Sequence, residues 1–484
     1  MSTMVPGREH VADANRVKTV RPRGRGGRVE WFVGLIVLTC TAGCYQKANE
    51  RTSRDDEWEG AGGAVSITGA GDCGEEFTLS TELSPEIPTV ATVTWSTTGA
   101  VESAHVDFGR QEGEWEYQAP VPNPELSGNE TMLLGMKPDT TYSLRVTTVN
   151  EDGDECRSPV QEITTGPKRS GLPPVSVTTR DPSRVYEGFT IACVFGLGSS
   201  SSSYTFILDK DGDYVWWYQP RVGADCVRAR MSYDGQYMWS ANGNVPGPNN
   251  GKLSRVRMDG TAERTYNLPY RHHDIAVLPD ERIAYFEYED GKAQACDVVK
   301  ELVPETGASL TVYNVADEHP SFGNSCHSNS INWWPEEGYY TLSVLDQNSI
   351  LAFERTGEPL WILGGRESTF SGADWRAQHG HHLLSSARIV LFNNQAAGGS
   401  AVLEYQFGGA EARLVWDYPS SNSTQSMGDV KRLPNDNTLI TYSNQGVIRE
   451  IDDSDQVVRE IVTSGIGYTV RRASLYGPPP PYGD

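Results

Sequence analysis

The stretch HDIAVLPDERIAYF, residues 273–286, contains the pattern that decides the fold of this chain. Two apolar runs flank a polar Leu-Pro-Asp turn, which predicts two strands joined as a hairpin. The same plan returns in NSINWWPEEGYYTLS (329–343), HHLLSSARIVLF (381–392) and GDVKRLPNDNTLITYS (428–443). Gly and Pro are abundant and long stretches with helical periodicity are missing, so the sequence predicts an all-β protein.

A second kind of half-unit ends in aromatic residues. It occurs as FILDKDGDYVWWYQP (206–220), ILAFERTGEPLWILGG (350–365) and EYQFGGAEARLVWDYP (404–419). Together with the hairpins it gives recurring units of roughly 40 to 60 residues from about residue 175 onward. Strands that alternate with polar turns at this repeat length are typical of the blades of a β-propeller, and five or six blades fit into residues 175–484.

Residues 69–167 have a different pattern. Short alternating runs such as TVATVTWSTTG (89–99) are separated by turn signals, which predicts an immunoglobulin- or fibronectin-like β-sandwich. Trp95 and Tyr142 are expected to pack in its core. The segment MKPDTTYSLRVTTVN (136–150) resembles the pattern of a fibronectin type III domain.

The N-terminal segment 1–44 reads as a signal peptide. A basic stretch precedes the apolar run WFVGLIVLTCTAG (31–43), which is short for a membrane span but suits a secretory signal. The ending TAGC resembles a bacterial lipobox, in which Cys44 is lipidated and anchors an exported protein to the membrane of the cell envelope. Ordinary signal cleavage nearby and an uncleaved anchor are the alternatives. Residues 45–68, polar and Gly-rich, are expected to form a flexible linker.

Charge and cysteine content narrow the functional classes. The formal net charge is −23 at pH 7, which disfavours a nucleic-acid partner and requires local positive charge at any anion site.

Six cysteines lie beyond the signal segment, and an even count in an exported chain indicates disulfides. Cys73 and Cys156 flank residues 69–167 and predict a bond there, whereas the sequence leaves the other pairings open. The sequence contains no Cys-x-x-Cys motif of the kind that would indicate a zinc site.

Six of the nine histidines of the chain lie in three short clusters, RHHD (271–274), CHSNS (326–330) and QHGHH (378–382). Counting back six residues from the turns at Pro279 and Ser385 reaches His273 and His379. Because side chains alternate along a strand, His327 falls on the corresponding face of a third hairpin. The innermost strands of a propeller line its central channel, so the three side chains are expected to converge there.

Converging imidazoles permit three interpretations. They can be polar residues at a wet channel mouth, they can bind a metal ion, or they can carry out nucleophilic and acid–base chemistry. The spacing adds no carboxylate or His-x-x-x-His signal for a metal. The residues alone leave the choice open.

Several motifs, taken in their order along the chain, resemble those of a known family. The segments HHDIAVLPD, CHSNSINWWP, LSVLDQNSILAFERTGEPLWILGG and QHGHHLLSSARIVLFNN resemble the bacterial arylsulfotransferase family over most of residues 180–470. The resemblance implies an exported six-bladed β-propeller that moves a sulfuryl group from a phenolic sulfate to a phenol without a nucleotide donor or other cofactor. It implies a sulfohistidine at His379. His273 or His272, together with His327, would bind sulfate oxygens and move the phenol proton.

Two positions depart from the family pattern. Leu345 stands where the family usually has a catalytic arginine, and Asn394 stands where an aspartate is common. Loss of a guanidinium from an anion site commonly costs on the order of a hundredfold in rate. We therefore expect Arg271 and Asn329 to help bind the substrate, and we note further candidate cations at Arg366, Arg376, Arg471 and Arg472. The alternative function is a propeller lipoprotein that has lost catalysis and binds a ligand or partner. The sequence does not indicate an oligomeric state.

Overall fold

The computed structural model describes residues 64–122, 129–195, 203–221, 225–243, 247–292 and 295–478. The fold is all-β, as predicted, and the helical elements in these ranges are short: α1 (Val315–Glu318), η1 (Pro182–Arg184), η2 (Glu289–Gly291), η3 (Pro320–Phe322), η4 (Leu345–Gln347) and η5 (Ser443–Gln445). None of the described helices has the length and apolar content needed to cross a bilayer. The expected signal segment 1–44, with Cys44, and most of the linker 45–68 lie outside the described residues.

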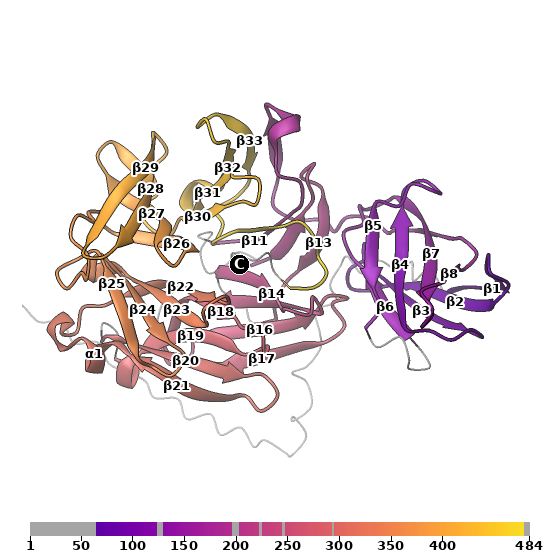
Figure 1. Cartoon of the computed structure of the whole chain (residues 1–484), viewed down its shortest axis with the longest axis horizontal. Coiled ribbons are helices and arrows are strands. Elements are labelled where there is room, and N and C mark those ends of the chain that lie inside the picture. The colour runs from indigo at the N-terminus through magenta and orange to yellow at the C-terminus, as the bar shows by residue number, and fades with distance from the viewer. Residues whose placement is uncertain are drawn as a thin grey trace, which may run out of the picture. The chain divides into compact units, whose positions relative to one another are not determined.

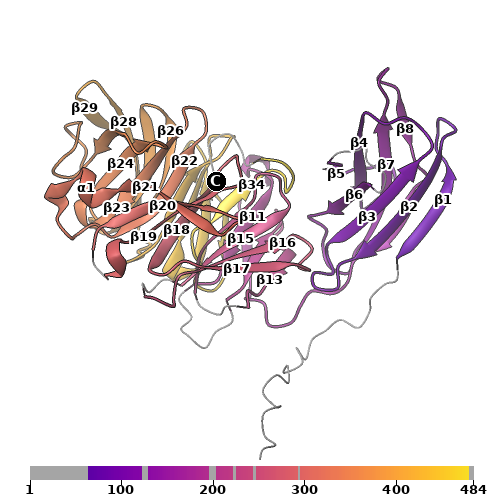
Figure 2. The same ribbon diagram turned by 90° about the horizontal axis from the view of Figure 1, so that it is seen from below.

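Two antiparallel sheets precede residue 167 (Figure 1, Figure 2). The first contains, in order, β1 (Val65–Ala70), β2 (Glu76–Leu83), β3 (Ala91–Thr97) and β6 (Asn129–Leu133). The second contains β5 (Tyr117–Pro120), β4 (Ser103–Gly109), β7 (Thr141–Val149) and β8 (Glu155–Arg157), with β9 (Gln161–Thr164) also paired to β7. Apolar residues from both sheets form one buried cluster that includes Trp95 and Tyr142, so both side chains are core residues, as predicted.

The first described strand begins earlier than the sequence indicated. β1 begins at Val65, inside the expected linker 45–68, and pairs with β2. None of the six residues of β1 is buried, because it is an edge strand. An edge strand without a buried face lacks the alternation of apolar and polar residues by which a strand is recognised.

Six further antiparallel sheets follow within the described part of residues 176–472. The first three contain, in order, β13 (Tyr214–Tyr218), β12 (Thr205–Leu208), β11 (Phe189–Cys193) and β34 (Val470–Arg472); β14 (Cys226–Met231), β15 (Tyr237–Asn242), β16 (Lys252–Arg257) and β17 (Glu263–Asn267); and β18 (Arg271–Val277), β19 (Ile283–Tyr288), β20 (Asp297–Val303) and β21 (Ala308–Asn314).

The other three contain β22 (Ser328–Trp334), β23 (Tyr339–Val344), β24 (Ser349–Glu354) and β25 (Pro359–Leu363); β26 (Gln378–Ser385), β27 (Arg388–Ala396), β28 (Gly399–Gly408) and β29 (Glu411–Ser420); and β30 (Asp429–Arg432), β31 (Thr438–Tyr442), β32 (Val447–Ile451), β33 (Val457–Val462) and β10 (Ser176–Thr179). The four hairpins quoted from the sequence are the first two strands of the last four sheets.

The topology closes this region on itself. Strand β34, at the C-terminal end of the region, pairs with β11 near its N-terminal end. Strand β10, at the N-terminal end, pairs with β33 near the C-terminal end. Figure 1 shows β11, β14, β18, β22, β26 and β30 arranged around one central region. Consecutive antiparallel sheets of four or five strands with this closure are typical of a β-propeller. Side chains on the first strands of different sheets are thereby brought towards one centre.

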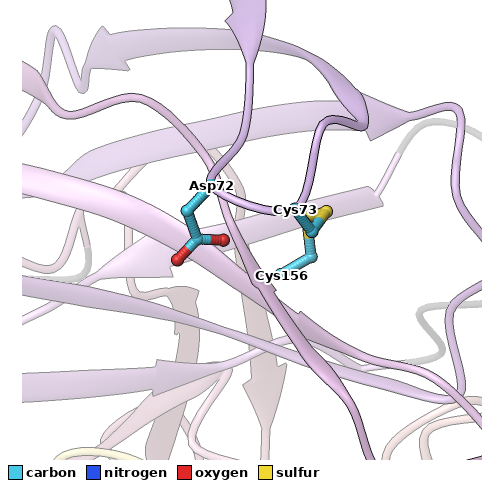
Figure 3. Close-up of side chains that lie close together, drawn as sticks. All are labelled: Asp72, Cys73 and Cys156. Atoms are coloured by element: carbon cyan, nitrogen blue, oxygen red, sulfur yellow. A yellow bond between two sulfur atoms is a disulfide. The ribbon is translucent and has the colours of Figure 1, made fainter.

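Three disulfides stabilise the structure. Cys73 pairs with Cys156, as predicted, and Figure 3 shows Asp72 beside this bond. The Asp72 carboxylate accepts a hydrogen bond from the Arg157 backbone N–H at 2.8 Å. The pairings that the sequence left open are Cys193–Cys226 and Cys296–Cys326. Three disulfides are typical of an oxidising, extracytoplasmic location.

Candidate active site

The structure brings four histidines together from three consecutive sheets. His272 and His273 lie on β18, His327 immediately precedes β22, and His379 lies on β26. The ring centre of His273 is 5.1 Å from that of His327 and 6.3 Å from that of His379. His327 is partly buried, whereas the other three are at most 7% exposed. The convergence expected from the hairpin register is therefore present.

The backbone is irregular at each of these places. Register shifts lie between Arg271 and Ile275 in β18, between Ser328 and Ser330 in β22, and between Gln378 and His381 in β26. His273 and His327 have φ angles of 48° and 51°, in the left-handed region that non-glycine residues rarely adopt. Such bulges and strained residues cluster at functional sites, because they aim a side chain away from the regular pleat.

Asn394 fixes the tautomer of His379. The amide nitrogen of Asn394 donates to the carbonyl oxygens of Thr424 and Met427, both at 2.8 Å, so its carbonyl oxygen must face the imidazole. That oxygen lies 2.7 Å from His379 Nδ1 and can only accept a hydrogen bond. Nδ1 therefore carries the proton and Nε2 carries the lone pair. Burial lowers the pKa of His379 to about 4, which keeps the ring neutral near pH 7.

A buried carboxylate begins a second chain of hydrogen bonds. Asp297 Oδ1 lies 2.8 Å from His272 Nε2, and His272 Nδ1 lies 2.9 Å from His273 Nδ1. The other oxygen of Asp297 accepts the Ser328 backbone N–H at 2.6 Å. Tyr288 stacks on the His272 ring with a centroid distance of 4.3 Å. Because both nitrogens of His272 are engaged, this residue orients His273 and connects it to Asp297.

The remaining two pKa shifts of the cluster have the same main cause. Burial lowers the pKa of His273 well below its usual value, and the neighbouring imidazoles of His272, His327 and His379 lower it further. Burial also lowers the pKa of His327, followed by the effect of His272. These shifts favour neutral rings at His273, His327 and His379, which can act as nucleophiles or proton acceptors near neutral pH.

The disulfide Cys296–Cys326 connects two parts of this site. Cys296 directly precedes Asp297 at the start of β20, and Cys326 directly precedes His327. Asp297 is a site residue that the sequence analysis missed. The available signal was its position next to one of six cysteines, but that signal has meaning only when the partner cysteine is known.

Arg271 lies beside the histidines, and among the described residues no carboxylate is within hydrogen-bonding distance of its guanidinium. Its guanidinium donates to the carbonyl oxygens of His273 at 3.1 Å and Gly243 at 3.3 Å, and also to that of Asn242. Burial lowers the pKa of Arg271 to about 10. Its bond to the His273 carbonyl supports the left-handed backbone at that residue.

Asn329 and Leu345 both lie next to the site through backbone contacts. The Asn329 amide donates to the Gln378 carbonyl at 2.7 Å and so joins β22 to β26. Leu345 is partly buried in η4, and its N–H donates to the His327 carbonyl at 3.2 Å. The hydrocarbon side chain at Leu345 supplies no charge near His327.

The other candidate arginines have different environments. Arg366 and Arg376 are exposed. Arg471 is buried and pairs with Glu450 at 3.3 Å, and Arg472 donates to a backbone carbonyl. For the described residues, the groups of three side chains that could hold a metal ion are Asp72, Cys73 and Cys156, and Asp209, Asp211 and Asp213. Neither group contains a site histidine.

Comparisons with known proteins relate a segment in the C-terminal half of the chain to one family. The family model for arylsulfotransferase (ASST) matches residues 305–464, a segment that contains His327 and His379 and begins after His273. No curated protein was found to match the sequence.

Three solved structures illustrate the structural comparison. A protein of unknown function from Bacteroides caccae is 14% identical, covers 59% of this chain and 99% of its own, and has a TM-score of 0.42. A putative 6-phosphogluconolactonase from Bacteroides fragilis is 14% identical, covers 59% and 98%, and has a TM-score of 0.40. A streptogramin B lyase is 13% identical, covers 60% and 88%, and has a TM-score of 0.38.

Proposed function

We propose that this protein, which carries an arylsulfotransferase (ASST) domain over residues 305–464, transfers a sulfuryl group from a phenolic sulfate to an acceptor phenol through a sulfohistidine at His379. The observation that carries the proposal is the state of His379. Its Nδ1 is committed to Asn394 at 2.7 Å, which leaves a lone pair on Nε2 in a ring close to His273. A neutral, oriented imidazole is a competent nucleophile.

In the first step, His379 Nε2 attacks the sulfur atom of the donor, and the bond between sulfur and the aryl oxygen breaks. The leaving phenolate takes a proton from His273 Nε2. His273 Nδ1 regains a proton from His272 along the hydrogen-bonded chain that begins at Asp297. In the second step the acceptor phenol gives its proton to His273 Nε2, the Nδ1 proton of His273 passes back to His272, and the phenol oxygen displaces His379 from sulfur. The two-step route divides one difficult displacement into two easier ones.

The oxygens of the transferring group need hydrogen-bond donors. We assign this role to His327, which lies 5.1 Å from His273 between ring centres and is the most exposed of the four rings. Asn329 and Arg271 shape the site by holding β26 and the His273 backbone. No cofactor enters this reaction.

A second candidate function follows from Leu345. If the family arginine is indispensable, the same channel binds an aryl sulfate or a partner without transferring the group. Leu345→Arg distinguishes the two, because restoring a cation beside His327 should raise the transfer rate of an impaired enzyme.

The fold assignment has two further parts. The six sheets of the described chain would be the blades of a six-bladed propeller over residues 175–484. The two preceding sheets would form a fibronectin type III-like sandwich over 69–167. The Tyr142 hydroxyl accepts the Lys137 backbone N–H at 2.9 Å, which supports this because such a tyrosine corner is a feature of these sandwiches.

Export would place the enzyme in the cell envelope, with a lipid anchor at Cys44. The Cys44→Ser protein should then leave the membrane fraction or stay unprocessed. Unchanged processing with membrane retention would exclude the anchor.

The chemical proposal is tested with the intact protein, 4-nitrophenyl sulfate and phenol. We expect release of 4-nitrophenol and an acid-labile sulfate on the peptide that contains residue 379. His379→Gln should abolish both signals. His319→Gln serves as the matched control, because His319 is a buried histidine outside the cluster. Its Nε2 lies 2.7 Å from the Tyr313 hydroxyl. Absence of label from every aryl sulfate, in both the natural protein and Leu345→Arg, would exclude the transferase.

A further inference from the structure

A pocket of about 680 Å³ lies between two neighbouring sheets, away from the histidine cluster. Its walls come from the sheet β26–β29 and from the sheet β30–β33, and β30 packs beside β26 and β27 (Figure 1). Leu384 and Ser385 line it at the end of β26, whereas His379 lies at the start of that strand. The pocket is therefore separate from the candidate active site, and its volume is within the range typical of small-molecule sites.

One wall of the pocket is the indole of Trp416, which is held in a fixed orientation. Its Nε1 donates to Asp455 Oδ1 at 2.9 Å, and the Arg432 guanidinium lies 4.9 Å from the ring centre. A register shift between β28 and β29 leaves Val415 without a partner, so Val415 and Trp416 both line the pocket although they are adjacent in sequence. Trp416 is only partly buried. An oriented, accessible indole offers apolar surface to a ligand at little cost in entropy.

A buried carboxylate fixes the two arginines of the lining. Glu404 is buried and pairs through one oxygen with Arg388 and through the other with Arg432. Arg432 also donates to the backbone carbonyl of Asp436 at 3.3 Å. Both guanidiniums are thus held in place, and their remaining N–H groups can donate to a ligand.

The turn between β32 and β33 supplies further carboxylates. Asp452 and Asp453 pair with Arg184 at 2.6 and 2.7 Å, and Asp452 also accepts the backbone N–H of Ser454 at 2.8 Å. Acidic side chains outnumber the arginines of the lining by five to two, and they remain in excess when Arg184 is counted. This excess disfavours an anionic ligand.

The pairing of these charges also disfavours a cationic ligand. A cation would compete with Arg184, Arg388 and Arg432 for carboxylates that already have partners, and opening a buried ion pair is costly. A neutral polyhydroxyl ligand can donate to the carboxylates and accept from the guanidiniums while the ion pairs stay formed. The C–H face of a sugar ring also fits against an indole. These features together favour a neutral sugar.

We propose that the pocket between β26–β29 and β30–β33 binds a neutral mono- or disaccharide. The Trp416 ring takes the C–H face of one sugar ring, and the fixed carboxylates and guanidiniums around it bind the hydroxyl groups. The site does not depend on the proposed sulfuryl transfer, since none of its residues belongs to the histidine cluster.

The proposal is tested on the whole protein by saturation-transfer difference NMR, with cellobiose, maltose and N,N′-diacetylchitobiose as probes. We expect a saturable signal from at least one of them. Trp416→Leu should weaken its binding by about tenfold or more, because the flat apolar wall is lost. Trp115→Leu is the matched control, since Trp115 is also partly buried and carries the Arg145 guanidinium 4.5 Å from its ring centre. No signal from any of the three sugars, or equal affinity in Trp416→Leu, would overturn the proposal.

A second variant decides the matter if Trp416→Leu fails to fold. Ser385 is exposed at the end of β26, and Ser385→Trp puts a bulky side chain into the pocket while both sets of ion pairs remain. Disaccharide binding should again fall by about tenfold or more, because the ligand and the new ring compete for the same space. Unchanged binding in this variant would contradict the assignment of the pocket.

Competing ligands test the position and the chemical class of the site. An excess of 4-nitrophenyl sulfate should leave the disaccharide bound, and displacement would place the sugar in the histidine channel instead. The uronic-acid form of the disaccharide that binds should do so more weakly than the neutral form, because the lining carries an excess of negative charge. Equal or tighter binding of the acidic form would overturn the neutral class.

Discussion

At the scale of single residues, the site depends on neutral side chains that fix where protons lie. Asn394 stands where an acidic residue is common in the family that the sequence resembles. Its amide oxygen accepts a hydrogen bond from His379, and its amide nitrogen donates to two carbonyl oxygens. An amide selects the tautomer without adding negative charge. The imidazole can therefore stay neutral while its lone pair is presented at Nε2.

The first prediction concerns Asn394. Asn394→Leu should lower the rate of sulfohistidine formation by about tenfold or more, because the His379 ring loses its fixed tautomer and orientation. Asn394→Asp should retain much more activity, since a carboxylate also accepts from Nδ1. Stopped-flow release of 4-nitrophenol measures this step. Asn435→Leu, at an exposed asparagine, is the control. Equal rates for Asn394→Leu and the natural protein would refute the orienting role.

The second prediction separates Asp297 from a purely structural residue. Asp297→Asn weakens the proton supply through His272 and His273. Donors that release a poorly acidic phenol need that proton, whereas 4-nitrophenolate leaves readily without it. We therefore expect a loss of about a hundredfold for phenyl sulfate and a much smaller loss for 4-nitrophenyl sulfate. A uniform loss for both donors would indicate that Asp297 only supports the fold.

At the scale of secondary-structure elements, the hairpins and the inner strands could be predicted, but their irregularities could not. The turn residues around Pro279, Pro335 and Pro434 locate three hairpins, and counting along them places His273 near the other clusters. The bulges that shift the register in β18, β22 and β26 depend on neighbouring sheets. A sequence pattern with a period of two residues carries no information about such contacts.

The same limit explains the site residues that the sequence did not reveal. Asp297 is on the third strand of its sheet, and it reaches His272 only because β20 runs beside β19. Asn394 was recognised as a departure from the family, but its role depends on carbonyls of Thr424 and Met427 in the next connection. Contacts of this kind are set by packing between distant segments and have no local signature.

The third prediction concerns the disulfide between β20 and the segment before β22. Cys296 and Cys326 close a loop with a sequence separation of 30 residues. The double change Cys296→Ala, Cys326→Ala should lower the free energy of unfolding by about 3 to 4 kcal/mol, from the loop-closure entropy. Because the bond also positions Asp297 beside His327, the activity of the folded variant should fall. Chemical denaturation and donor kinetics measure the two effects, with Cys73→Ala, Cys156→Ala as the control that should leave the kinetics unchanged.

At the scale of the whole molecule, closure of the chain into a ring buries several imidazoles at once, and this gives a final prediction about acid stability. Burial lowers the pKa of His379 to about 4 and that of His381 to about 3, and it lowers those of His273 and His327 as well. In the unfolded chain a histidine has a pKa of about 6.5. The unfolded state therefore binds more protons between these values, and stability falls as the pH drops through this range.

The size and the pH window of the effect are specific. A drop in pKa from 6.5 to about 4 for His379 corresponds to a loss of stability on the order of 3 kcal/mol, which is absent above pH 6.5 and complete near pH 4. Carboxylates with lowered pKa, such as Asp274, lose their contribution only below about 3.8, so the two classes separate. Urea unfolding from pH 7 to pH 4 should show the decline, and His379→Gln should flatten its slope, since glutamine does not titrate. A stability that stays constant between pH 6.5 and 4.5 would mean that the buried rings do not hold their neutral form in the fold.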